Sequence, residues 1–153
     1  MGLFFKKRSD DIIGEVKAFL ENDLIISKKA CGMSEDTVEK SLVPQLKEKF
    51  GKDNVKNQCI RGENLKLKCD IDMFSGKCGI ELKVAHHLTR ADEFQRAIGQ
   101  VACYSQDQYR NTGIILLVVG KNAEIPENID KLKTIVGYFP RVHFVYKQAA
   151  NKT

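Results

Sequence analysis

The chain has 153 residues, of which 42% are hydrophobic and 29% charged, and these values suit a single globular domain. A net charge of +5 and a pI of about 8.9 would suit a polyanionic partner but do not require one. Five cysteines without a Cys-x-x-Cys pair argue against a zinc site or a disulfide framework. The longest apolar run, residues 114–119, is too short to span a bilayer. We therefore expect a cytoplasmic protein with no membrane partner.

Residues 1–30 predict a helical extension. Met1–Arg8 joins apolar residues to basic ones, and Ser9 could cap a helix whose first turn holds Asp10 and Asp11. An apolar stripe follows at helical spacing, formed by Ile12, Val16, Phe19 and Leu20. This stripe predicts either packing against the body of the protein or contact with a second copy in a homodimer.

A second helix is expected after the loop at 28–32, with Ser34 as its cap. Its apolar positions recur every four residues, at Val38, Leu42, Leu46 and Phe50. Pro44 lies inside the pattern and predicts a kink or break near Val43. Glu39 falls within the apolar stripe, where a carboxylate needs a cation, a hydrogen bond or water. It would either join an acidic site or cap a group at the rim, whereas Glu35, one turn earlier, is expected to be more exposed.

The central feature of the sequence is a predicted hairpin over residues 65–84, LKLKCDIDMFSGKCGIELKV. Apolar and polar residues alternate on both sides of Ser75 and Gly76, which supply turn chemistry. A first strand over 54–60 and a turn over 61–64 precede this hairpin. We therefore expect three consecutive strands, of which the last two form an antiparallel hairpin.

Four charged residues share one face of the hairpin, namely Asp70, Asp72, Glu81 and Lys83. They could simply form a solvent-facing surface. However, two acids are unusual in the middle of a strand, and the second strand is strongly apolar around its charges, as in a central covered strand. Side chains opposite each other on antiparallel strands have β-carbons about 5 Å apart, so one carboxylate from each strand could bind one small cation. Oxygen ligands of this kind suit Mg²⁺ or Mn²⁺.

The rest of the chain alternates helices and strands. We expect a loop over 85–89, a helix over 90–108, a buried parallel strand over 114–120, a short helix over 129–138 and a final strand over 142–146. We expect the long helix to pack through Phe94, Ala97, Ile98, Val101 and Ser105. Gln100 and Tyr104 lie on the flank of that stripe, one turn apart.

Basic residues near the predicted acidic site could contact a phosphate backbone. These candidates are Lys68, His86, His87, Arg90 and Arg96. Each could equally be an ordinary surface charge. The adjacent histidines at a strand end point to different sides, which disfavours a shared catalytic role for them.

In its order of elements and its motifs the chain resembles the restriction-endonuclease-like PD-(D/E)xK nuclease superfamily. The matching residues are Asp70 and, in the next strand, Glu81-Leu82-Lys83. The helix segment 95–104, QRAIGQVACY, resembles the R-x-x-GQ-x-x-x-Y helix of some members. The resemblance covers roughly residues 34–146 and omits the N-terminal helix. The proline that often precedes the first acid is replaced by Cys69.

This resemblance implies an α/β fold with an α-β-β-β-α-β core, a mixed central sheet flanked by helices, here with an extra N-terminal helix and a C-terminal helix and strand. It implies a metal site formed by Asp70, Glu81 and the Leu82 carbonyl, with Asp72 as a less suitable ligand. Glu39 stands where such nucleases often carry a helical acid.

The residues themselves suit phosphodiester hydrolysis. Lys83 would contact the phosphate and the attacking water, and Gln100 would orient one of these or simply join the helix to the sheet, with Tyr104 as a secondary site residue. We therefore expect a Mg²⁺- or Mn²⁺-dependent DNA endonuclease. The alternatives are a binding module for nucleic acid or protein on an inactive nuclease fold, and a structure-specific enzyme that cuts branched DNA as Holliday-junction resolvases do.

Overall fold

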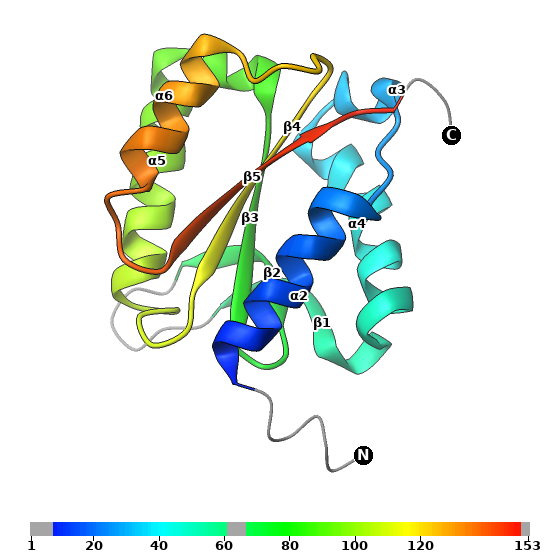
Figure 1. The fold of residues 1–153 in the computed structure, drawn as a ribbon, viewed down its shortest axis with the longest axis vertical. Coiled ribbons are helices and arrows are strands. Elements are labelled where there is room, and N and C mark those ends of the chain that lie inside the picture. The colour runs from blue at the N-terminus through cyan, green and yellow to red at the C-terminus, as the bar shows by residue number, and fades with distance from the viewer. Residues whose placement is uncertain (1–7, 61–66, 151–153) are drawn as a thin grey trace.

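The computed structural model describes residues 8–60 and 67–150. Five strands form one mixed sheet, and helices cover both of its faces (Figure 1). The strands are β1 Val55–Ile60, β2 Lys68–Met73, β3 Cys78–Val84, β4 Ile114–Gly120 and β5 Val142–Gln148. The helices are α2 Ser9–Asn22, α3 Lys28–Cys31, α4 Glu35–Phe50, η1 Lys52–Asn54, η2 Ala85–Thr89, α5 Ala91–Gln106 and α6 Glu127–Val136. The predicted α/β class with a mixed sheet between helices is confirmed.

The sheet joins an antiparallel half to a parallel half. Its strands lie in sequence order, from β1 to β5. β1, β2 and β3 pair antiparallel, whereas β3, β4 and β5 pair parallel. The parallel pairs need crossover connections, which α5 and α6 supply. β3 therefore lies in the middle of the sheet, between an antiparallel and a parallel neighbour.

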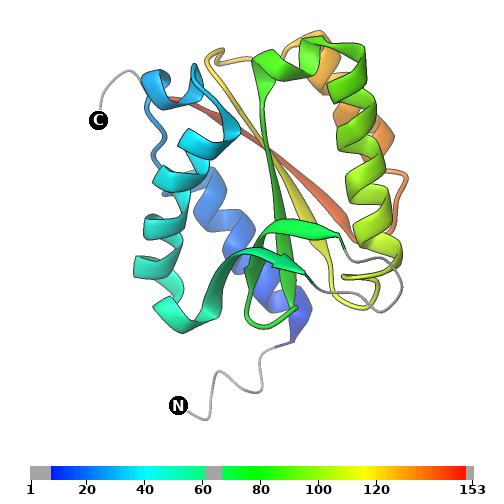
Figure 2. The ribbon, with the colours of Figure 1, turned by 180° about the vertical axis from the view of Figure 1, so that it is seen from behind.

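Each face of the sheet has its own core. Helices α2 and α4 cover one face, and α5 and α6 cover the other, as opposite views show (Figures 1 and 2). Ile80, Leu82 and Leu117 belong to the core under α2 and α4. Leu116 and Val118 belong to the core under α5 and α6. Side chains on neighbouring positions of a strand thus enter different cores, as the pleat requires.

The N-terminal helix is part of the first core. The predicted stripe of α2 is buried there, together with Ile13, and no residue of that stripe is more than 7% exposed. The packing alternative for this helix is therefore confirmed, and its apolar face is not available to a second copy.

Several local predictions need correction. Ser9 is the first helical residue of α2, with Arg8 at the cap position and no side-chain cap bond. The loop expected over 28–32 contains the short helix α3, capped by the Ser27 hydroxyl, which accepts a hydrogen bond from Ala30 N–H. The predicted break near Val43 is wrong, because α4 continues through Pro44. Buried residues on both sides of that exposed proline hold the helix together despite the missing hydrogen bond.

Other boundaries follow the sequence closely. Ser34 caps α4 as predicted, since its hydroxyl accepts a hydrogen bond from Thr37 N–H at 3.2 Å. The helix expected over 90–108 spans Ala91–Gln106, and the one expected over 129–138 spans Glu127–Val136. The predicted turn over 61–64 lies outside the described residues. Within the described part of the chain, every helix is too short or too polar to cross a membrane.

Candidate active site

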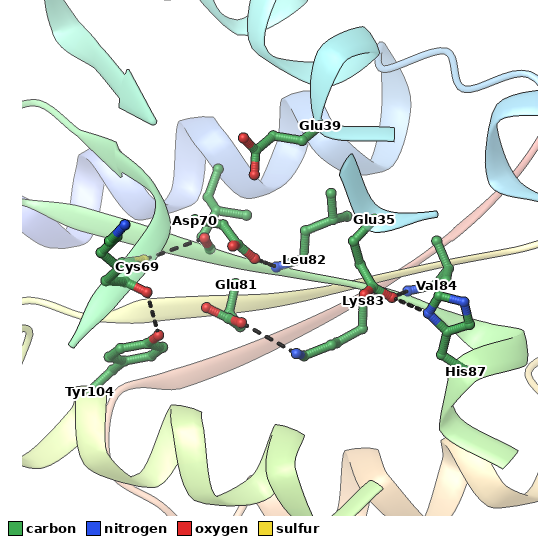
Figure 3. Close-up of polar contacts among 12 residues, drawn as sticks. Glu35, Glu39, Cys69, Asp70, Glu81, Leu82, Lys83, Val84, His87 and Tyr104 are labelled. Carbon is green, nitrogen blue, oxygen red and sulfur yellow. Dashed lines mark hydrogen bonds and ion pairs between the residues drawn. The ribbon is translucent and has the colours of Figure 1, made fainter. Parts of the chain in front are cut away.

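The candidate site lies where β2 separates from β3. Their ladder pairs residues 71–73 with residues 78–80 and stops there, although β3 continues to Val84. Beyond the ladder, carboxylates bind the backbone amides on this edge of β3. Asp70 Oδ2 accepts a hydrogen bond from Leu82 N–H at 2.8 Å, and Glu35 Oε2 accepts one from Val84 N–H at 3.0 Å (Figure 3). The unpaired strand edge therefore brings two acids from different parts of the chain to one place.

Glu81 and Lys83 are buried in the middle of the sheet. Leu82 packs into the core under α2 and α4, so its two neighbours face the opposite side, toward α5. The side chains of Glu81 and Lys83 are 3% and 7% exposed, and Lys83 Nζ lies 3.4 Å from Glu81 Oε2. Glu81 Oε1 is buried and accepts no hydrogen bond from the described residues. A buried carboxylate oxygen without a donor is costly unless a cation or water binds it.

The acids of the site hold their protons more tightly than isolated carboxyls do. Burial raises the pKa of Glu81 to about 8, and the Asp70 charge adds to this, while Lys83 partly offsets it. Burial also raises the pKa of Asp70, against the lowering effect of the Leu82 amide and Lys83. The pKa of Glu39 is raised by burial and then by the Asp70 charge. Burial thus disfavours the charged forms of these acids, and a bound cation would offset that cost.

These residues open into a cleft of about 320 Å³. Its walls come from the β2–β3 fork, the start of α4, η2 and α5, and they carry charges of both signs. The lining residues are Glu35, Asp70, Glu81, Leu82, Lys83, His87, Arg90, Glu93, Arg96 and Gln100. The structure thus brings together Asp70, Glu81, Leu82, Lys83 and Gln100, as the sequence predicted.

The cleft offers an incomplete but suitable set of oxygen ligands for a divalent cation. Among residues 8–60 and 67–150, no cluster of three or more His, Cys, Asp or Glu side chains is placed to hold a metal. Two carboxylates are present, Asp70 and Glu81, together with the Leu82 carbonyl, which points toward β2 as its N–H does. Mg²⁺ commonly uses one or two carboxylates and keeps several waters. The donor set, with its unsatisfied Glu81 oxygen, therefore fits such a cation.

Glu39 approaches the site indirectly. The Gln58 amide nitrogen donates to Glu39 Oε1 at 3.1 Å and to Asp70 Oδ1 at 3.4 Å, so Gln58 lies between the two acids. Gln58 has a positive φ of 54°, in the strand segment opposite Asp70. Glu39 does not line the cleft, whereas Glu35 does. Glu35 also binds His87 Nδ1 at 2.8 Å, so this acid links α4, β3 and η2.

The sequence did not predict that Glu35 and Gln58 belong to the site. The position of Glu35, one helical turn before Glu39 and in the first turn of α4, was the available signal for it. No signal identified Gln58, which appeared only as part of the first strand. Its contribution depends on the pairing of β1 with β2 and on a left-handed backbone angle.

Hydrogen bonds within the fold occupy both carboxylate oxygens of Asp72. Its Oδ1 accepts a hydrogen bond from the Tyr109 hydroxyl at 2.7 Å, and its Oδ2 accepts one from Gly76 N–H at 3.0 Å. Asp72 is 1% exposed and does not line the cleft, so Asp70 is the better candidate ligand of the two. Tyr104 is also buried, and its hydroxyl donates to the Lys68 carbonyl at 2.8 Å.

The predicted phosphate contacts divide into three groups. His87, Arg90 and Arg96 line the cleft. Lys68 is exposed on β2 outside it. His86 lines a different cavity. The two adjacent histidines thus serve different surfaces, as expected from their positions at a strand end.

Comparisons with known proteins found no match for the chain. No family model matches the sequence, and neither the curated proteins nor the solved structures contain a significant match. Function must therefore be inferred from the cleft itself, above all from its buried acid–lysine pair and the arginines around it.

Proposed function

We propose that this protein is a metal-dependent nuclease that hydrolyses DNA phosphodiester bonds, on a restriction-endonuclease-like core. The observation that carries the proposal is the buried pair of Glu81 and Lys83 beside Asp70, in a cleft that also holds Arg90 and Arg96. A buried acid with an unsatisfied oxygen is hard to explain as scaffold. It is expected where a cation and a charged substrate meet.

In this proposal each residue has a separate task. Asp70, Glu81 and the Leu82 carbonyl would hold Mg²⁺ or Mn²⁺ by oxygen ligands. The bound ion would supply charge neutralisation on the phosphate and a lowered pKa for a coordinated water. Lys83 projects beside Glu81 and would contact a phosphate oxygen and the attacking water.

The α5 wall would bind and orient the substrate. Gln100 lines the cleft, and its buried Oε1 accepts no hydrogen bond from the described residues, so it is available to orient a water. Arg90 and Arg96 would hold backbone phosphates on the same wall. Arg90 now contacts Asp92 at 3.0 Å on the exposed surface, an ion pair weak enough for a phosphate to replace it.

The test is cleavage of labelled linear duplex, single-stranded and four-way-junction DNA, with Mg²⁺, Mn²⁺ or a chelator. Wild type would be compared with Asp70→Asn and Lys83→Ala, and with Asp53→Asn and Lys49→Ala as charge-matched exposed controls. We expect metal-dependent cleavage that falls by about 10²–10³-fold or more in the two cleft variants and is unchanged in the controls.

Binding and folding must be measured beside activity. Circular dichroism would establish that each variant folds, and anisotropy would measure DNA binding. Intact binding without cleavage of any substrate under any metal would overturn the nuclease proposal in favour of a binding module. Metal-dependent cleavage that persists in Asp70→Asn would show that the reaction is not carried out in this cleft.

A further inference from the structure

A second cavity adjoins the cleft at the carboxyl ends of β3 and β4. It has a volume of about 470 Å³, which lies in the range of small-molecule sites. In open α/β sheets ligands commonly bind beyond the carboxyl ends of parallel strands. The lining residues are Cys31, Gly32, Ala85, His86, Thr89, Gly120, Lys121, Asn122, Pro126 and Asn128.

Among the residues that line this cavity, the formally charged side chain is that of Lys121. Lys121 is exposed and lies close to both His86 and the buried Cys31. Burial lowers the pKa of His86, and the charges of His87 and Lys121 lower it further against the opposing effect of Glu35. The Cys31 thiol donates to the Val119 carbonyl at 3.5 Å and forms part of the wall. An ammonium at the mouth with no acid among the lining residues suits an anionic ligand.

The rest of the wall suits a flat, polar ring. Ala85, Gly120 and Pro126 supply small or apolar surfaces, and the His86 imidazole supplies an aromatic face of the kind on which bases stack. The Asn128 amide nitrogen donates to the Leu88 carbonyl at 3.1 Å, which directs its amide oxygen away from that bond. Amide groups beside an aromatic face are the usual elements of base recognition.

Helix η2 forms a wall of both cavities. His87 lines the cleft and is held there by Glu35, whereas His86 lines the second cavity, and their ring centroids are 4.3 Å apart. One ligand could therefore reach from the Glu81–Lys83 pair over η2 into the second cavity. A nucleic acid strand is such a ligand, since it repeats a phosphate and a base at every residue.

We infer that the second cavity is a subsite for one unpaired nucleotide of the substrate strand, with its phosphate at Lys121 and its base on His86. This inference rests on the proposed function, since it places the adjoining phosphate in the cleft. A base inside a duplex must first be unstacked and unpaired, which costs a few kcal/mol, and an already unpaired base avoids this cost. The subsite therefore predicts a preference for flapped, gapped or branched DNA over intact duplex.

The first test measures nucleotide binding without cleavage. Deoxyadenosine monophosphate, deoxycytidine monophosphate and inorganic phosphate would be titrated into the full chain by NMR. The variants are Lys121→Ala, His86→Ala and Gly32→Ala, with Lys49→Ala as the control on a separate cavity. Gly32→Ala changes no charge, and its new Cβ would lie 3.0 Å from Lys121 Nζ, so the ammonium must shift by a few tenths of an ångström. We expect wild type to bind mononucleotides more tightly than phosphate. Lys121→Ala should bind mononucleotides at least tenfold more weakly than wild type, and Lys49→Ala should bind them with unchanged affinity.

The second test uses DNA itself. Oligonucleotides with one unpaired nucleotide next to the cut position would be compared with matched duplexes. Binding would be measured with the Asp70→Asn protein, and KM and kcat with protein that keeps Asp70. We expect Lys121→Ala and His86→Ala to raise KM for the unpaired substrate at least fivefold and to leave the duplex nearly unaffected. Mononucleotide binding without any advantage for the unpaired strand would overturn the subsite in favour of a site for free nucleotides.

The two proposals can fail separately. If the protein cuts DNA but neither Lys121→Ala nor His86→Ala alters nucleotide binding or KM, the subsite is wrong and the nuclease proposal stands. If no DNA is cut but unpaired DNA binds through Lys121 and His86, the subsite is supported and the nuclease proposal fails. Equal losses in Lys121→Ala and Lys49→Ala would indicate general electrostatic attraction and would overturn the subsite.

Discussion

β3 and β4 lie side by side, have seven residues each and are buried along their whole length, but they differ in what they bury. β4, IILLVVG, places only apolar side chains and one glycine between the helix layers. β3, CGIELKV, places a carboxylate and an ammonium there as well. Apolar burial is favourable without further conditions, whereas a buried charged pair recovers its lost hydration only with good partners. β4 therefore stabilises the fold, and β3 carries groups that function explains better than stability does.

The neighbours of the two strands differ in the same way. β4 has a parallel partner on each side along its length. β3 has β4 on one side but only a short ladder with β2 on the other, so carboxylates of Asp70 and Glu35 complete its edge. The region with incomplete strand pairing is thus the region with the unusual chemistry. Substitutions in the two strands should separate these roles.

The largest expected effect on stability is in β4. Leu117 is fully buried in the core under α2 and α4, so Leu117→Ala should lower the free energy of unfolding by about 2–5 kcal/mol. Urea unfolding followed by circular dichroism would measure this. Met33→Ala serves as a control, because Met33 is 58% exposed and its truncation leaves no cavity. Equal losses in the two variants would contradict a core role for β4.

The sequence predicts β4 and the period-two hairpin because both signals are local. Six consecutive aliphatic residues predict a covered strand, and alternation around Ser75 and Gly76 predicts the strand pair. These patterns also placed Glu81 and Lys83 on one face, because residues two apart on a strand must share it.

The remaining parts of the site depend on contacts that no local pattern contains. Glu35 reaches Val84 across 49 positions of sequence, and the Tyr109 hydroxyl reaches Asp72 across 37. The early end of the β2–β3 ladder could not be predicted either, since the alternation continues through Asp70 without interruption. These long-range contacts decide which of the two aspartates enters the cleft.

Substitution of Glu81 in β3 should raise the free energy of unfolding at high pH, whereas Leu117→Ala in β4 lowers it. Its folded pKa of about 8, raised by burial and then by Asp70, exceeds its ordinary value of 4.5, so the folded state binds the proton more tightly. The resulting stability is present below pH 4.5 and is lost as the pH rises through about 8. Glu81→Gln removes this loss, and the variant should therefore be more stable than the wild type at pH 9, by about 1–3 kcal/mol, and similar to it at pH 5.

Unfolding curves of the metal-free proteins between pH 5 and 9 would measure this difference. Glu48→Gln, at an exposed position of α4, is the matched control and should follow the wild-type curve. Mg²⁺ should reduce the difference in free energy of unfolding between wild type and Glu81→Gln at pH 9. A cation bound to the Glu81 carboxylate stabilises the folded wild type and not the amide variant. If the free energies of unfolding of wild type and Glu81→Gln change with pH in the same way, burying the Glu81 charge has no cost.

The smallest expected effect concerns the edge of β3. Glu35→Ala removes the acceptor of Val84 N–H and the partner of His87, in a half-exposed place where water can replace part of the loss. We expect about 0.5–1.5 kcal/mol of destabilisation and faster hydrogen exchange at the Val84 amide. Asp36→Ala is the matched control, because it removes a neighbouring acid from the same helical turn but only an exposed pair with Lys40. If both variants have the same Val84 exchange rate, the carboxylate of Glu35 does not complete the strand edge. A faster rate in Glu35→Ala alone would separate this edge from β4, whose amides are protected by strands on both sides.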